Sequence, residues 1–159
     1  MGYRGGTNLA ARYMARMNLA DVLATVPFAH RADLEIVHAE PGHVVVRIAN
    51  EPKVQNHVGM VHAAALVLVG ETAGGLAILN EERLAAYMLL AKGLNIRYRK
   101  PGLTAVSASA RITDAQVAAT VQAVETVGKC DLPLAIELRN EAGEVVAELT
   151  VDYHLRQKA

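Results

Sequence analysis

The sequence predicts an α+β fold in which an antiparallel sheet of about six strands wraps around one apolar helix. The main evidence is the stretch 56–79, in which a polar loop runs into a segment that is apolar on nearly every side. A helix of that kind belongs inside a structure rather than on its surface. Before and after it, polar and apolar residues alternate with the period of strands. Most links between these strands are short, and a short link can join antiparallel strands but not parallel ones, so we expect an antiparallel sheet.

Composition and charge limit the classes to which this protein can belong. The chain has 159 residues, of which 52% are apolar and 20% charged, as in a single folded domain. Sixteen basic residues balance sixteen acidic ones, so no overall charge attracts nucleic acid. Glu71 and three glycines inside the apolar stretch argue against a membrane span. Cys130 is the only cysteine and the N-terminus lacks the apolar core of a signal peptide, so we expect a cytoplasmic protein.

The first expected element is a helix that begins at Thr7 or Asn8 and runs to about Ala24. Both of the starting residues cap helices well, and apolar side chains then recur at helical spacing. Pro27 ends the helix, because the residue before a proline avoids helical geometry. Residues 1–30 therefore form an N-terminal helix and its lead-in to the sheet.

A β-hairpin comes next. Residues 34–38 and 43–48 are extended runs on either side of Pro41–Gly42, which is a strong turn signal. Residues 51–59 then form a loop, and the central helix runs from there to about Asn80.

The second half of the sequence adds four strands and one inserted helix. The expected strands are residues 86–100, 104–112, 132–138 and 145–155. Thr113 and Gln116 have the spacing of a capping box, and Gly128 is a natural helix stop, so we place the inserted helix at residues 114–128. No linker, repeat or low-complexity segment interrupts the chain, so residues 1–159 form one domain.

The position of Glu71, in the middle of the apolar helix, is the feature of the sequence that most needs an explanation. A carboxylate in the middle of an apolar helix is unfavourable unless it is paired, protonated or in use. The alternative is an ion-paired or solvent-facing side chain at an edge of the fold. We favour a function, because the helix has no polar face on which to expose this side chain.

A pattern around Glu71 carries a family resemblance. Asn56, the triplet His62-Ala63-Ala64 and Glu71 follow one another at spacings of six and nine residues. This pattern resembles the signature of hotdog-fold acyl-CoA thioesterases of the phenylacetate-pathway type, which has an Asn, a His-Gly-Gly and an acid on the central helix. The run 95–101 is similar to the strand that follows in that superfamily. The two additional helices look more like a branch described only as a domain of unknown function.

The resemblance implies a hotdog fold and the hydrolysis of an acyl thioester, with Asn56 positioning the thioester or the water. If His62 opens the helix, the amides of Ala63 and Ala64 have no partner within it. A helix start offers donors and partial positive charge, which suits a thioester oxygen as negative charge grows on it. Glu71 then acts as a general base on water or as a nucleophile that forms an anhydride. A His62 ring that merely holds the loop is an equally good interpretation.

The spacing also predicts how the site is assembled. His62 and Glu71 are nine residues apart, which is about half a turn off alignment and roughly 13 Å of rise along a helix. They point to opposite sides and cannot meet at one site within one chain. In a two-fold homodimer the helix start of one chain can meet Glu71 of the other, as in hotdog thioesterases. Pairing of such dimers into a homotetramer stays open. A stripe of small residues suits close contact with the sheet or with the partner helix: Ala63, Gly70, Gly74 and Ala77.

Two departures from the family pattern keep other functions open. His-Gly-Gly reads His62-Ala63-Ala64 here, which keeps the amides but adds two Cβ atoms where the thioester approaches. Residues 86–92 contain no Ser or Thr of the kind that some relatives use to hold water. The first alternative is an acyl-thioester binding protein without catalysis. The second is a hotdog hydratase or dehydratase, which pairs a histidine with the acid across the dimer.

The expected substrate contacts lie on the strand after the helix and in the loop before it. Arg97, Arg99 and Lys100 are candidates for the phosphates of coenzyme A, although a solvated strand face explains them equally well. Gly59 is the candidate in the loop. No cofactor is expected, because coenzyme A enters as part of the substrate. The acyl group and the choice between coenzyme A and acyl carrier protein stay open.

Histidine pairs raise the question of a metal. Two pairs of histidines lie close together in the sequence: His57 with His62, and His38 with His43. Neither spacing places two rings on one helical face, and loop histidines are common, so the sequence predicts no metal site.

Overall fold

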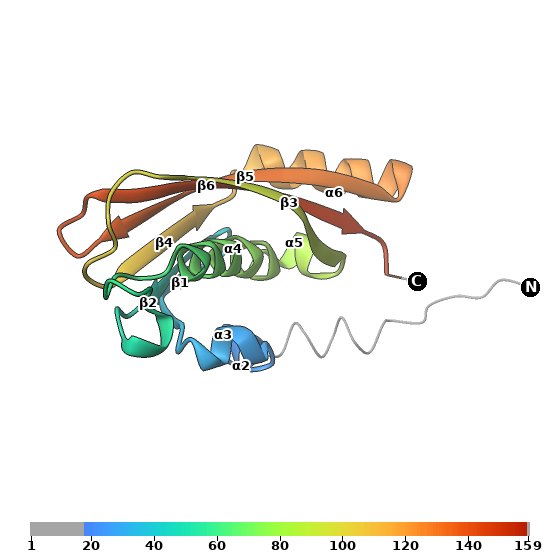
Figure 1. Cartoon of the computed structure of the whole chain (residues 1–159). Helices are drawn as coiled ribbons and strands as arrows, with labels where there is room; N and C mark the ends of the chain where they lie inside the picture. The colour runs from blue at the N-terminus through green and yellow to red at the C-terminus, as the bar shows by residue number, and fades with distance from the viewer. Residues whose placement is uncertain (1–17, 159) are drawn as a thin grey trace, which may run out of the picture.

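The computed structural model describes residues 18–158, and its main feature is a six-stranded sheet curved over one long helix, α4 (Ala63–Leu79) (Figure 1). The strands are β1 (Glu35–Glu40), β2 (His43–Ile48), β3 (Met88–Tyr98), β4 (Val106–Arg111), β5 (Lys129–Asn140) and β6 (Val145–Arg156). Every pair of neighbouring strands is antiparallel. The predicted α+β architecture, with the sheet around the apolar helix, is confirmed.

The strand order in the sheet is β1-β2-β4-β5-β6-β3. In each of the hairpins β1–β2 and β5–β6, the two strands are neighbours in the sequence and in the sheet, as the short turn between them predicts. β3 and β4 are also joined by a short segment, but they are not neighbours: β3 lies at one edge beside β6, and β4 lies between β2 and β5. The Pro101–Gly102 segment is therefore a crossover and not a hairpin turn.

The two faces of the sheet differ in polarity. Along β5 and β6 buried and exposed residues alternate, and the buried set packs on α4. We call the face toward α4 the inner face and the opposite one the outer face. The outer face carries polar side chains, as alternation in a half-buried antiparallel sheet requires.

α4 is held closely against the inner face. Eight of its seventeen residues are buried, and they include Gly70 and Gly74. A Cβ on Gly70 would lie 2.5 Å from Leu149 Cδ2, and one on Gly74 would overlap the Tyr153 hydroxyl. The stripe of small residues thus contacts the sheet at these two glycines, which was one of its two predicted roles. Half-exposed residues of α4 gather on another side of the helix: Ala65, Val67, Leu68, Glu71, Thr72, Gly75 and Leu79.

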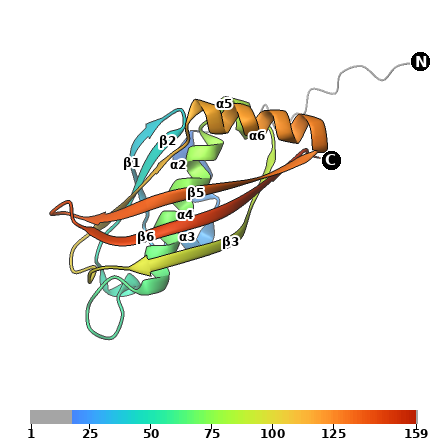
Figure 2. The same cartoon turned by 90° about the horizontal axis from the view of Figure 1, so that it is seen from above.

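Within residues 18–158, four shorter α-helices surround this core, and a single 3₁₀ turn, η1 (Pro52–Val54), precedes α4. α2 (Leu19–Ala24) and α3 (Pro27–Arg31) lie on the side of α4 away from the sheet, whereas α5 (Glu82–Ala85) follows α4 and packs on α6 (Asp114–Val127), which also contacts β5 (Figures 1 and 2). Thr113 and Gln116 form the predicted capping box of α6, and Gly128 ends the helix in a left-handed conformation.

The predicted first helix needs a correction. Asn18 has extended backbone geometry and its side chain accepts a hydrogen bond from Asp21 N, so it begins α2. A continuous helix to Ala24 is therefore wrong at this point, because asparagine stabilises a helix start better than a helix interior. The predicted starts at Thr7 and Asn8 lie outside the described residues. The helices α3 and α5 were not predicted.

The long apolar stretch raised the question of a membrane span. Over residues 18–158 no helix combines the length and the apolar character needed to cross a membrane.

Candidate functional site at the central helix

The start of α4 is organised by His62. Its backbone is extended and its ring Nδ1 accepts a hydrogen bond of 3.0 Å from Ala64 N–H, which makes it the N-cap of the helix. The ring therefore satisfies one of the amides that the sequence offers to a thioester oxygen. The Ala63 amide has no hydrogen bond in the part of the chain that the structure describes. Both alanines are exposed, so this helix start is open to an approaching group.

The loop before α4 is folded around Asn56. Its Oδ1 accepts hydrogen bonds of 3.1 Å from both Val58 N–H and Met60 N–H. Gly59 has a positive φ of 76°, which glycine adopts without strain. The Asn50 side chain donates to the carbonyl oxygens of Gly59 and Leu103, at 3.1 and 3.0 Å. The oxygen of Asn56 thus shapes the loop, and Nδ2 is the atom left to contact a ligand.

Glu71 lies two turns further along α4, on its half-exposed face. Among the described residues, the carboxylate has no hydrogen bond and no ion pair. Burial raises the pKa of this group above its ordinary value of 4.5. A partnerless carboxylate with a raised pKa on an apolar surface is what a general base requires.

Two tyrosines that sequence reasoning missed hold α4 in place. Tyr98, from β3, donates a hydrogen bond of 3.1 Å to the Ala63 carbonyl oxygen. Tyr153, from β6, is buried and donates a bond of 2.5 Å to the Glu71 carbonyl oxygen. Burial, and then the charge of Glu71, raise the pKa of Tyr153, so its hydroxyl stays protonated and keeps donating. The alternation of residues 145–155 was the available signal, because it turns Tyr153 toward the helix.

The raised pKa of Glu71 predicts how the free energy of unfolding depends on pH. The folded chain holds this proton more tightly than the unfolded chain, so between the ordinary pKa of 4.5 and the raised value stability falls as pH rises. Glu71→Gln removes this loss. Above that window we expect the variant to be more stable than the native chain by about 1 kcal/mol, a modest value because the group is partly solvated.

Urea unfolding of both proteins from pH 4 to pH 8 measures this difference. The advantage of the glutamine variant should grow as pH rises and then become constant. Parallel stability curves for the two proteins would show that Glu71 has the same pKa in the folded and unfolded chains.

The cations suggested for coenzyme A lie on β3 and just after it. Arg99 binds Glu148 on β6, with Nε at 2.9 Å from Oε2, and Lys100 Nζ lies 2.5 Å from Glu144 Oε1. Both cations therefore already have carboxylate partners. Arg97 is exposed and has no ion pair among the described residues. Its register partner on β6 is the outward-facing Glu148, which places Arg97 on the outer face as well.

The structure therefore brings together part of the predicted site. The loop at Asn56, the His62 cap and Tyr98 meet at the start of α4, whereas Glu71 lies further along the helix and Arg97 lies on the other face of the sheet. One chain provides a helix start and a carboxylate that are separated along the same helix.

Comparisons with known proteins add the family and the fold. A model of the family described as Domain of unknown function (DUF4442) matches residues 15–155. No curated protein matches the chain in sequence.

Solved structures share this architecture over most of the chain. One, described as a protein of unknown function and probable thioesterase from Pseudomonas aeruginosa, is 27% identical, with 99% of this chain and 100% of that chain covered and a TM-score of 0.78. A substituted thioesterase enzyme from Staphylococcus aureus is 20% identical, with 82% and 99% covered and a TM-score of 0.67. The PaaI protein of the E. coli phenylacetic acid degradation operon is 17% identical, with 92% and 96% covered and a TM-score of 0.68. The predicted hotdog fold and the resemblance to this thioesterase superfamily are confirmed.

Proposed function

This chain belongs to the DUF4442 family, a domain of unknown function, and we propose that it hydrolyses an acyl-CoA thioester. The observation that carries the proposal is the Glu71 carboxylate, which is half-buried on an apolar helix and has no partner among the described residues. The likeness to a Pseudomonas aeruginosa protein described as a probable thioesterase supports the same reaction class.

In the proposed reaction, Glu71 takes a proton from water while the water oxygen attacks the thioester carbonyl carbon. The carbon–sulfur bond then breaks, and the proton that Glu71 took passes to the departing sulfur, so the products are the free acid and coenzyme A as a thiol. In the second form of the mechanism Glu71 itself attacks the carbonyl carbon, the carbon–sulfur bond breaks and coenzyme A leaves as a thiolate, and water then hydrolyses the resulting anhydride to the free acid and the Glu71 carboxylate. Both forms need the carboxylate to be ionised, and both benefit from a raised pKa.

The start of α4 is the proposed site for the thioester oxygen. The Ala63 amide is available in the structure, and the Ala64 amide becomes available when the His62 ring turns away from it. Two amides aimed at one developing negative charge stabilise it more than either alone. Asn56 Nδ2 and Gly59, in the loop beside this helix start, are the proposed contacts for the thioester.

The complete site is proposed to lie between two chains. β3 is an edge strand of eleven residues that, in the described part of the chain, pairs only with β6, and long unpaired edges are natural places for a second chain to add. Leu94 and Tyr98 on this strand are each 48% exposed although their register partners Val151 and Ala147 are buried on the inner face. A second chain at this edge would cover them, together with the half-exposed face of α4 that carries Glu71.

Leu94→Glu is expected to convert a homodimer into monomers, because it places a charge on the apolar edge that the partner should cover. Light scattering after size exclusion measures the result directly. The native protein should have twice the 17.0 kDa chain mass, and the variant should have the single mass. Thr150→Glu is the matched control, since it adds the same charge one strand further in, on the outer face. A native monomer, or a Leu94→Glu dimer, would exclude this edge as the interface.

Thiol release from short, medium, long and aryl acyl-CoAs tests the proposed reaction and identifies the acyl group. The same acyl groups on acyl carrier protein distinguish the two carriers. Turnover of any member supports hydrolysis, and no turnover from any member at high protein concentration excludes it.

The proposal includes a cytoplasmic location and no cofactor other than the coenzyme A of the substrate.

One observation favours a second function, the binding of an acyl thioester without hydrolysis. The His62 ring already occupies the Ala64 amide, so the helix start has one donor fewer for a developing oxyanion than the sequence suggested. Saturable binding of an acyl-CoA, measured by calorimetry, with no thiol released would identify this function.

A further inference from the structure

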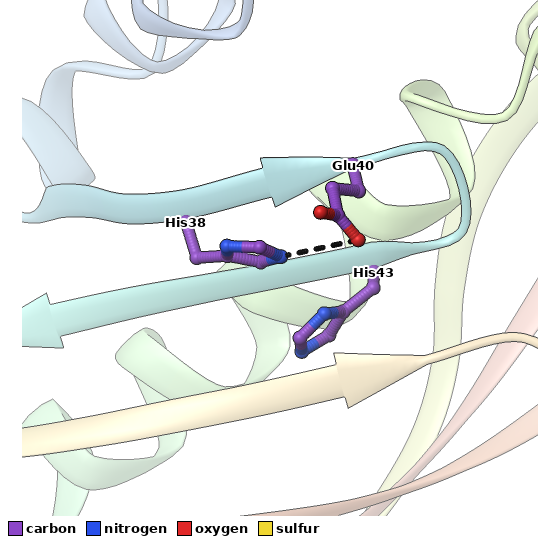
Figure 3. A group of neighbouring side chains, drawn as sticks. All are labelled: His38, Glu40 and His43. Atoms are coloured by element: carbon purple, nitrogen blue, oxygen red, sulfur yellow. Dashed lines mark ion pairs between the residues drawn. The ribbon is translucent and has the colours of Figure 1, made fainter.

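The tip of the β1–β2 hairpin gathers two histidines and a glutamate that the proposed hydrolysis does not use. His38, Glu40 and His43 each offer one ligand atom, and the three atoms all lie within 4.8 Å of one another (Figure 3). The register explains the convergence. Glu40 lies directly opposite His43, and His38 precedes Glu40 by two residues, so all three side chains are on one face of the hairpin.

That face is the outer one. Val44, Val46 and Ile48 alternate with His43 along β2 and are fully buried toward α4, so His43 points away from the helix. The cluster is therefore separated from Glu71 by the thickness of the sheet, and the inference below does not depend on the proposed hydrolysis.

The three side chains of the cluster make no hydrogen bonds to one another. His38 Nε2 is buried, has no hydrogen-bond partner, and lies 3.6 Å from Glu40 Oε2, which is too far for a hydrogen bond. The two imidazole rings lie close together, with centroids 4.5 Å apart and planes tilted by 47°. A buried ring nitrogen without a partner is unfavourable unless something fills the space in front of it.

We propose that His38, Glu40 and His43 form a binding site for a divalent transition-metal ion, with zinc as the first candidate. Two imidazoles and one carboxylate are a ligand set that zinc accepts, and a water or another ligand then completes the coordination. Ligands on one zinc ion are about 3.4 Å apart, so the cluster needs only small side-chain rotations to close on the metal. Glu40 is largely exposed and is free to make the largest of these rotations.

Ser109 on β4 supports this assignment. Its hydroxyl oxygen lies 3.1 Å from His43 Nε2, which leaves Nδ1 of that ring as the nitrogen for a metal. Metal-binding histidines commonly have their second nitrogen hydrogen-bonded in this way, because the bond fixes the ring and its tautomer. Arg111 lies opposite His43 in the register and opposes a bound cation, and the Glu40 carboxylate offsets that charge.

Zinc titration of the untagged chain tests the proposal, with affinity measured by competition against a chromogenic chelator. The native protein is expected to bind one Zn²⁺ per chain, and the double variant His38→Gln/His43→Gln to bind at least tenfold more weakly. Glu40→Gln should give a smaller loss. The matched control is His154→Gln, which breaks a different histidine–carboxylate pair on the same face, where His154 Nδ1 lies 2.6 Å from Asp131.

A second readout reports the ligands themselves. Co²⁺ bound in place of zinc should give visible absorption bands with the native chain and with His154→Gln, but not with the double variant. Thermal unfolding of each variant without metal shows whether it is folded. The proposal is overturned if the native chain binds no zinc at tens of micromolar, or if the double variant binds it as tightly as the native chain does.

Discussion

Replacing Glu71 with glutamine is expected to lower the turnover number for the best acyl-CoA by about 10²–10⁴-fold, the contribution of a well-placed general base. Glutamine has nearly the same size and still fits the half-exposed face of α4, but it cannot take a proton from water or attack the carbonyl carbon. Because the site for the substrate is left in place, KM should change much less than the turnover number. Steady-state thiol release over a range of substrate concentrations separates the two constants.

Glu125→Gln is the matched control for this experiment. Glu125 is also a glutamate inside a helix, but it is exposed on α6, and its substitution should leave turnover unchanged. Circular dichroism and light scattering verify that both variants keep the fold and the assembly state of the native protein. Full activity in a folded Glu71→Gln variant would remove Glu71 from the mechanism and leave the helix start without its proposed base.

Gly74→Ala is expected to destabilise the protein by about 1–3 kcal/mol, the usual effect of overpacking a closed core. The added Cβ would overlap the Tyr153 hydroxyl and would lie 2.9 Å from Ile136 Cδ1. Tyr153 cannot move aside without losing its hydrogen bond to the Glu71 carbonyl oxygen. For a chain of this length the change corresponds to a fall in Tm of roughly 2–10 °C.

Gly75→Ala separates this packing effect from helix propensity. A Cβ on Gly75 meets no atom within 4 Å, and alanine favours a helix over glycine by about 1 kcal/mol. The control should therefore unfold at a higher temperature than the native protein, whereas Gly74→Ala unfolds at a lower one. A Gly74→Ala variant as stable as Gly75→Ala would mean that the sheet can move away from α4 at little cost.

The parts of the fold that the sequence predicted well are those specified by local chemistry. The apolar length of α4, the turn at Pro41–Gly42 and the capping box at Thr113 each depend on a few neighbouring residues, and each is present in the structure. The partners of β3 and β4 depend on which distant strand covers which part of α4, and no local signal encodes that choice. The break at Asn18 was missed because apolar periodicity outweighed the preference of one asparagine for a helix start.

The candidate site shows the same division. Glu71 was found because a charge in an apolar helix has a large free-energy cost wherever the helix lies. The bond from Ala64 N–H to the His62 ring could not be predicted, because it depends on one side-chain rotamer. The ion pairs of Arg99 and Lys100 depend on register with β6, which the sequence does not reveal. The sequence predicted no metal site at His38 and His43 from helical spacing; these residues lie on a hairpin, where cross-strand register decides which side chains meet.

The position of β3 in the sheet also determines when this protein can complete its fold. β3 precedes β4, β5 and β6 in the chain, yet within residues 18–158 its only strand partner is β6, which is synthesised after the other five strands of the sheet. On the ribosome, β3 therefore has no strand partner, and one side of α4 is uncovered, until β6 has emerged. Cotranslational folding should begin with the β1–β2 hairpin and finish late, and the nascent chain should bind chaperones through residues 63–98 until β6 arrives.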